Sequence, residues 1–248
     1  MGDLFDIGKA GISAYKSALA TTGQNIANVD TEGYNRRETK IEELSSSSAD
    51  ILSISNSSGL GVRMGEITRA FDQFLDIKLQ SSTSSYSFAK SKSEIFDQLE
   101  STLIPKNATV GTRLREFFDG LSNLAQDPDN ANLRRLALSG ANAVSASISE
   151  LHGGLSDLRT VTHGTLELTV ADFNSTLKNL SHVQNEILGN SVKSGSPHGL
   201  LDRRDTLLEQ LSEIADISVD YQANGSVTVS LGKLGAVGTL LEGATFNE

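Results

Sequence analysis

Two aspartates flank two arginines in the segment Asp202-Arg203-Arg204-Asp205, which is the strongest candidate for chemistry in the chain. Carboxylates three residues apart lie on the same side of a helix, where they could exchange protons or bind a cation. In a structural interpretation, Asp202 lies in the first turn of a helix, where the helix dipole favours it, and the arginines pair with neighbouring helices. We favour this structural interpretation, because neither a histidine nor a burial signal accompanies the two carboxylates.

No other group of residues has the spacing of an active site or a metal centre. The segment 232–238 has a glycine at every third position, but it lacks the Lys-Ser/Thr pair of a phosphate-binding loop. The sequence contains no G-x-S-x-G nucleophile elbow and no cysteine. We therefore expect no catalytic residue, no metal and no cofactor. The four histidines are too widely spaced to resemble a short metal-ligand motif: His152, His163, His182 and His198.

The composition narrows the function classes further. The net charge is −10, and the sequence contains no stripe of Lys and Arg residues, so a nucleic-acid-binding surface is not expected. Aromatic residues make up 5% of the chain, which predicts thin cores and favours an elongated structure. The first residues include two aspartates where a cleaved secretory signal is basic, and no apolar run has the length of a membrane span. We therefore expect no membrane insertion, and an uncleaved route for any export.

A helix is predicted over residues 4–28, and one line of its side chains forms a heptad seam. The spacing of 4 and 3 residues places this line along one side of the helix. A second line of small and apolar residues runs beside it, from Leu4 to Ala18. Such a helix needs cover from the chain or from another subunit, because isolated helices are marginal in water. The six residues of the line, here called the assembly seam, are Gly8, Ile12, Tyr15, Leu19, Thr22 and Ile26.

The segment after this helix contains residues that an ordinary amphipathic helix does not require. Asn25 and Asn28 can bond to backbone near a helix end, and Gly33 supplies the positive φ of a sharp turn. Tyr34 adds apolar area with a polar tip that can reach a neighbour. The alternation of residues 36–44 then predicts an extended segment.

The rest of the sequence predicts a mainly α fold with a small β part. Helices are predicted at 68–103 and 109–126. A heptad repeat with one phase change predicts a coiled-coil-like helix over about 130–188. We expect this helix to be kinked or broken near Gly153-Gly154 or Gly164, because glycine is unfavourable inside a helix. A polar loop at 189–199 precedes a short amphipathic helix that begins at Leu200. Asn224-Gly225 predicts a type I′ turn in a β-hairpin over 216–231, and Leu240-Leu241 opens a third strand. The expected segments are a terminal helix with its extended segment (1–44), a Ser-rich connector (45–67), an elongated helical bundle (68–215) and the β-rich start of a further domain (216–248).

Two motifs carry a resemblance to a known superfamily. Gly11-Ile-Ser-Ala14, followed by the segment from Thr22 to Tyr34, resembles the N-terminal motif of the bacterial flagellar axial proteins, which include rod, hook and hook–filament junction proteins. Asp127-Pro-Asp129 with Arg134-Arg135, and the segment Leu200–Asp205, resemble the hook-associated proteins of the junction. We therefore treat Asn25, Asn28, Gly33 and Tyr34 as an axial-protein motif, and Leu201, Asp202, Arg203, Arg204 and Asp205 as a junction-protein motif.

The resemblance implies a non-enzymatic structural subunit outside the cell, in the flagellum at the hook–filament junction. Such a subunit is exported unfolded through the flagellar type III apparatus. Its implied partners are copies of itself in the junction ring, the hook protein, a second junction protein and an export chaperone. Family members are longer and end in a second heptad helix that pairs with the first. We therefore expect this chain to be an N-terminal portion, with the assembly seam exposed or disordered when the chain is isolated.

Three other functions remain open at this stage. A flagellar hook or rod protein would share the first motif, but it is expected to lack a helix of about 60 residues. A secreted coiled-coil adhesin or binding module would use the helical rod to present its β tip. A hydrolase that uses Asp202 or Asp205 is the least supported class.

Overall fold

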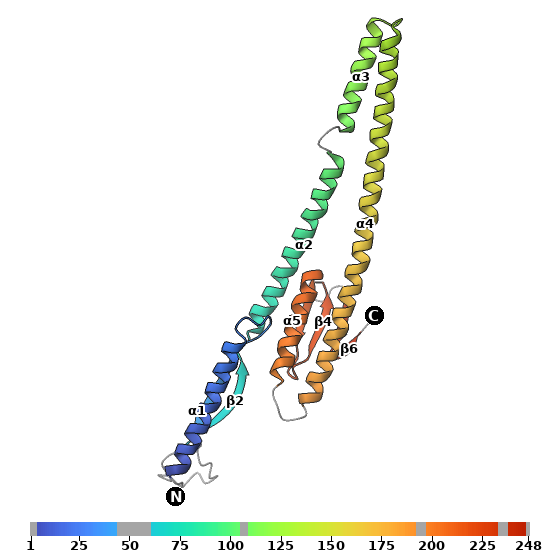
Figure 1. Cartoon of the computed structure of the whole chain (residues 1–248). Coiled ribbons are helices and arrows are strands. Elements are labelled where there is room, and N and C mark those ends of the chain that lie inside the picture. Colours follow the sequence, from blue (N-terminus) through green and yellow to red (C-terminus); the bar gives the residue numbers. More distant parts are fainter. Residues whose placement is uncertain (1–3, 44–60, 105–108, 192–196, 233–237, 247–248) are drawn as a thin grey trace. The chain divides into compact units, whose positions relative to one another are not determined.

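The computed structural model describes residues 4–43, 61–104, 109–191, 197–232 and 238–246, and these residues form a mainly α fold with a small β part (Figure 1). The predicted fold class is confirmed. In chain order the elements are α1 (Leu4–Ala27), β1 (Arg37–Glu43), β2 (Val62–Arg69), α2 (Gln73–Leu103), α3 (Val110–Gln126), α4 (Ala131–Ser191), α5 (His198–Ile214), β3 (Ile217–Tyr221), β4 (Val227–Leu231), β5 (Gly238–Glu242) and β6 (Thr245–Phe246). Among the described helices, none is long and apolar enough to cross a membrane.

The chain divides into two compact units, residues 1–83 with 176–248, and residues 84–175. In the second unit, helices pack closely where side chains are small. A Cβ on Gly140 would lie 3.3 Å from the Cα of Phe117, and one on Gly120 would lie 3.8 Å from the Cα of Ala137. The Thr109 hydroxyl accepts a hydrogen bond from the Thr112 amide at 3.1 Å and caps α3. This unit contains Asp127–Arg135 of the junction resemblance, and the residues of the axial-protein motif and of Leu201–Asp205 lie in the first unit.

Several predicted element boundaries and one predicted helix break need correction. The helix predicted from residue 68 begins at Gln73, because Val62–Arg69 form strand β2. The Asp72 carboxylate caps this helix by accepting hydrogen bonds from the amides of Phe74 and Leu75. The connector predicted at 45–67 is therefore wrong for its last residues, and the remainder, 45–60, lies outside the described residues. Helix α4 is one continuous element of 61 residues, so the predicted break at its glycines is wrong, and it extends into the loop predicted at 189–199.

The first unit contains an apolar core between helices and a four-stranded antiparallel sheet. The end of α4 and the whole of α5 pack with strands in the order β3-β4-β5-β6, and α5 and β4 are visible beside the end of α4 in Figure 1. The buried Gln184 on α4 accepts a hydrogen bond from the Val227 amide at 2.7 Å, which ties α4 to the sheet. The core consists of Leu177, Leu180, Ile187, Leu207, Leu208, Leu211, Ile217, Val219, Val227, Val229 and Leu241.

The β-hairpin and the third strand are confirmed, but the turn differs from the predicted type I′. The Gly225 amide donates to the Gln222 carbonyl at 3.0 Å, and the Gln222 amide donates to the Ser226 carbonyl at 2.9 Å. The turn therefore begins at Gln222, and Gly225, with φ +83°, follows its two central residues. Hairpin strands are commonly joined either by a two-residue type I′ turn or by a three-residue loop whose last residue is left-handed. An Asn-Gly pair fits both connections, so the sequence did not distinguish them. Most of the glycine-rich segment 232–238 lies outside the described residues.

Helix α1 packs on an antiparallel ribbon of two strands. Strands β1 and β2 pair from Arg37 opposite Arg69 to Glu43 opposite Val62. Ala14 and Thr21 are buried on α1, and the Thr39 hydroxyl on β1 donates to the Thr21 hydroxyl at 3.0 Å. The predicted terminal helix and the predicted extended segment are both confirmed, with α1 ending one residue earlier than expected.

Candidate functional site

The assembly seam lies on an uncovered side of α1. Ile12 is 73% exposed and Leu19 is 72% exposed, whereas Ala14, on the neighbouring line of small residues, is 2% exposed. The other four seam residues, Gly8, Tyr15, Thr22 and Ile26, are also exposed. The ribbon therefore buries Ala14 on the second apolar line, whose first residue, Leu4, is 87% exposed, and it leaves the seam open.

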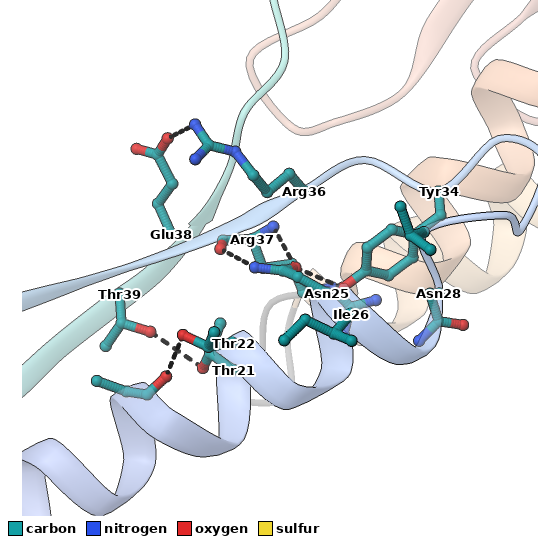
Figure 2. A pocket seen from close by; sticks show the side chains of 12 residues that line it. Thr21, Thr22, Asn25, Ile26, Asn28, Tyr34, Arg36, Arg37, Glu38 and Thr39 are labelled. Carbon is teal, nitrogen blue, oxygen red and sulfur yellow. Dashed lines mark hydrogen bonds and ion pairs between the residues drawn. The ribbon is translucent and has the colours of Figure 1, made fainter.

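The last turns of the seam open into a groove of about 740 Å³ between the end of α1 and the start of β1 (Figure 2). Thr22 and Ile26 of the seam line its helical side, and Tyr34 and the first residues of β1 line the other side. The groove is therefore continuous with the seam, and three residues of the axial-protein motif, Asn25, Asn28 and Tyr34, help to line it.

The Asn25 side chain joins the end of α1 to the start of β1, because its amide group makes the same pair of hydrogen bonds to Arg37 that a neighbouring strand residue would make. Its Nδ2 donates to the Arg37 carbonyl at 2.9 Å, and its Oδ1 accepts from the Arg37 amide at 2.9 Å. The Tyr34 hydroxyl donates to the same Oδ1 at 2.8 Å, and the Arg37 guanidinium lies 5.3 Å from the centroid of the Tyr34 ring. Figure 2 shows Asn25 between the Tyr34 ring and the Arg37 backbone, with its hydrogen bonds drawn as dashed lines. An alanine at position 25 could make none of these bonds.

Asn28 and Gly33 shape the turn that follows α1. The Asn28 amide group donates to the Gln24 carbonyl at 2.9 Å, and its Oδ1 accepts from the Thr31 hydroxyl at 3.2 Å. Gly33 has φ +74°, which confirms the positive φ predicted for it. A Cβ on Gly33 would overlap the Thr206 hydroxyl on α5. This turn therefore touches the helix that carries the junction-protein motif.

The two aspartates of the junction-protein motif bind residues of the ribbon. Arg69 on β2 forms ion pairs with both, through Nε to Asp202 Oδ1 at 2.9 Å and through Nη2 to Asp205 Oδ2. Asn35 donates to Asp202 Oδ1 at 3.2 Å, and the Arg37 guanidinium lies 3.7 Å from Asp202 Oδ2. The axial-protein and junction-protein motifs therefore meet in one polar cluster. Sequence reasoning missed Arg69, because no local pattern distinguishes it from an exposed strand arginine.

The arginines of the motif have different surroundings. Arg204 is 3% exposed and donates through Nε and Nη2 to Asp205 Oδ1 at 2.8 and 2.6 Å. Its Nη1 donates to the Gly225 carbonyl at 2.6 Å, and its guanidinium lies 4.9 Å from the Tyr221 ring centroid. The predicted pairing with neighbouring helices is therefore wrong for Arg204, because the β-hairpin covers this side of α5. Arg203 is exposed at a second groove of about 500 Å³, and Leu201 is half-buried.

Asp76 on α2 extends the cluster toward the hairpin. Its Oδ2 accepts hydrogen bonds from the Tyr221 hydroxyl and, at 2.7 Å, from Gln80 Nε2. Burial raises the pKa of Asp76 above its ordinary value, with a smaller contribution from the negative charge of Asp205. Burial and the hydrogen bond to Asp76 also raise the pKa of Tyr221. These carboxylates bind arginine, tyrosine and glutamine donors of the same chain, which is the arrangement of a structural network.

The described residues contain no group of three or more histidine, aspartate or glutamate side chains that could hold a metal ion. The contacts described for the Asp202 and Asp205 side chains are with arginine guanidinium groups and the Asn35 side-chain amide. What the arrangement can do is hold elements together and leave one side of α1 open for contact.

Comparison with known proteins identifies the family. The model of the family described as flagellar hook-associated protein FlgK helical domain matches residues 96–248, and that of the flagella basal body rod protein family matches residues 5–35. Flagellar hook-associated protein 1 of Bacillus subtilis is 27% identical over 250 residues, which cover 95% of this chain and 49% of that protein. The protein of the same name from Salmonella typhimurium is 25% identical, over 99% of this chain and 43% of that protein.

A solved structure is also similar. The flagellar hook junction protein FlgK from Burkholderia pseudomallei has a TM-score of 0.62 and 25% identity, and the match covers 68% of this chain and 29% of that one. The chain spans about half the length of the curated relatives that it matches. With one family model covering more than half of its residues, the chain belongs to the FlgK helical-domain family of flagellar hook-associated proteins.

Proposed function

We propose that this protein is a structural subunit of the bacterial flagellum, which assembles at the distal end of the hook and joins the hook to the filament. The observation that carries the proposal is the open assembly seam on α1 in a chain that belongs to a family of flagellar structural proteins. Large apolar side chains that are about 70% exposed along one side of a helix indicate an interaction surface. The protein acts in this role by contact and without catalysis.

The proposed partners follow from this location. They are copies of the chain in a junction ring, the hook protein and a second junction protein, with an export chaperone and the flagellar type III apparatus acting before assembly. The role needs neither a nucleic acid nor membrane insertion. A hook or rod protein is the related alternative, since a rod protein family model matches residues 5–35. The helical-domain match over residues 96–248 favours the junction, because it covers a much larger part of the chain.

The proposal can be tested in cells that lack their own copy of the gene and express a substituted one. Leu19→Asp places a charge in the middle of the seam, and the control Ala20→Asp places the same charge on the exposed neighbouring position outside the seam. We expect Ala20→Asp cells to carry filaments, and Leu19→Asp cells to carry complete hooks and release filament subunits into the medium.

Export must be measured separately, because α1 lies at the end of the chain that carries the proposed export signal. The amount of each variant in the culture medium gives this control. Normal filaments on Leu19→Asp cells would contradict the proposed role of the seam. Incomplete hooks in cells that lack the gene would contradict the junction role and favour the hook or rod alternative.

A further inference from the structure

The first compact unit contains two packed parts and the start of α2, and the contacts described between the two parts are polar. One part is α1 with the β1–β2 ribbon, here called the terminal module (residues 4–69). The other is the end of α4 with α5 and the four-stranded sheet, here called the hairpin module (residues 176–246). The hairpin module has an apolar core of its own. Side chains from the end of the ribbon reach Asp202 and Asp205, and Gly33 lies against Thr206.

Two arginines stand directly opposite each other in the ribbon. Arg37 and Arg69 are register partners in the antiparallel pair, so their side chains lie on the same face of the ribbon. Like charges directly opposite each other destabilise a pair of strands. The Arg69 side chain is 6% exposed, so water offers it little compensation. Burial of this face therefore requires negative charge from outside the ribbon.

Helix α5 supplies that negative charge. Asp202 lies within ion-pair distance of both arginines, and Asp205 pairs with Nη2 of Arg69 while Asp202 pairs with its Nε. These aspartates are three residues apart on the helix, so both point to the ribbon and present two carboxylates to one planar guanidinium. The other carboxylate oxygen of Asp205, Oδ1, forms an ion pair with Arg204, whose guanidinium also contacts the hairpin at Gly225.

We propose that Arg69 is a positioning residue, which together with Arg37 docks the terminal module on Asp202 and Asp205 and so fixes the direction in which the assembly seam is presented. The junction-protein motif then acts as an internal clasp, and its aspartates face the chain's own ribbon. Each module has packing of its own, α1 on the ribbon and the apolar core around α5. Without the clasp, the described contacts that remain include those of Gly33 with Thr206 and of Phe71 and Asp76 with Tyr221. We expect them to allow the terminal module a range of orientations while the helices stay folded.

The test measures the distance between the modules in the whole chain by pulsed electron paramagnetic resonance. The sequence has no cysteine, so spin labels attached through Lys16→Cys on α1 and Glu213→Cys on α5, two exposed positions, are specific. Arg69→Gln removes the clasp. Its matched control is Arg63→Gln, on the same strand, where the arginine is exposed and pairs with Glu42 at 3.0 Å. We expect one narrow distance peak in the native background and in Arg63→Gln, and loss of that peak in Arg69→Gln.

Circular dichroism decides whether that loss reflects orientation or unfolding. A narrow, unchanged peak in a helical Arg69→Gln chain would overturn the proposal. If Arg69→Gln loses its helical signal, the double variant Asp202→Asn/Asp205→Asn is measured in the same way, and a narrow peak there overturns the proposal too. Loss of helix in both variants would show that the cluster holds the fold rather than the direction of one module, and would also reject the clasp. The isolated chain is measured, so the result is independent of where the protein assembles.

Discussion

Replacing Gly33 by alanine should lower the free energy of unfolding, because the turn that follows α1 packs against α5 at this residue. Gly33 has φ +74°, and a residue with a Cβ pays about 1–2 kcal/mol for this left-handed conformation. The new Cβ would also overlap the Thr206 hydroxyl, which donates to the Asp202 carbonyl at 3.0 Å. If the hydroxyl rotates away, one hydrogen bond worth about 0.5–1.5 kcal/mol is lost. Together these effects predict a loss of about 1.5–3.5 kcal/mol.

Urea unfolding followed by far-ultraviolet circular dichroism gives the free energy of unfolding of each variant. In a Thr206→Ala background the hydroxyl is absent, so Gly33→Ala should cost only the conformational part, about 1–2 kcal/mol. Gly23→Ala is the matched control, because Gly23 lies within α1 and a Cβ there meets nothing within 4 Å. That substitution should stabilise the chain by about 0.5–1 kcal/mol.

The reasoning fails if Gly33→Ala costs less than about 0.5 kcal/mol, the size of an ordinary surface substitution. It also fails if Thr206→Ala leaves the cost unchanged, because the two residues would then not be in contact. Either result would separate the axial-protein motif from the helix that carries the junction-protein motif.

Two further substitutions test the cluster around this contact. Asn25→Ala removes three hydrogen bonds and should lower the free energy of unfolding by about 1–3 kcal/mol. Hydrogen exchange should show that the Arg37 amide loses its protection in this variant. Unchanged protection of that amide would contradict the contact. Asp76→Asn should remove a pH dependence. Because the pKa of Asp76 is raised in the folded state above its ordinary value of 3.8, its stabilising contribution is present below that pH and is lost as the pH rises through the folded-state pKa. The difference in stability between the native chain and the variant, measured by urea unfolding across acidic pH, should therefore fall as the pH rises; a constant difference would contradict burial of this carboxyl.

The helices were predictable from sequence because their signals are local. The heptad rhythm of α4 and the small-residue lines of α1 each repeat within a few residues, so no distant partner is needed to recognise them. Gly33 was predictable for the same reason, since a glycine in the short segment between a helix and an extended stretch indicates a turn with positive φ.

Strand β2 and the residues that join the modules depend on distant partners. Most of Val62–Arg69 is exposed or half-exposed on both faces, so the strand shows no clean alternation of apolar and polar residues. Arg69 lies 136 positions from Asp205, and nothing near it in sequence predicts an ion pair at that separation. The structural interpretation placed Asp202 in a helix, but the element that supplies Arg69, the partner of both aspartates, could only come from tertiary structure.

The most direct test of the proposed function asks whether the assembly seam becomes buried in the flagellum. A single cysteine at Leu19, 72% exposed in the isolated chain, gives a unique site for a maleimide reagent, because the native sequence has no cysteine. We predict rapid labelling of Leu19→Cys in the purified chain and strong protection of the same cysteine in isolated hook–filament complexes. Equally rapid labelling in both preparations would contradict the account.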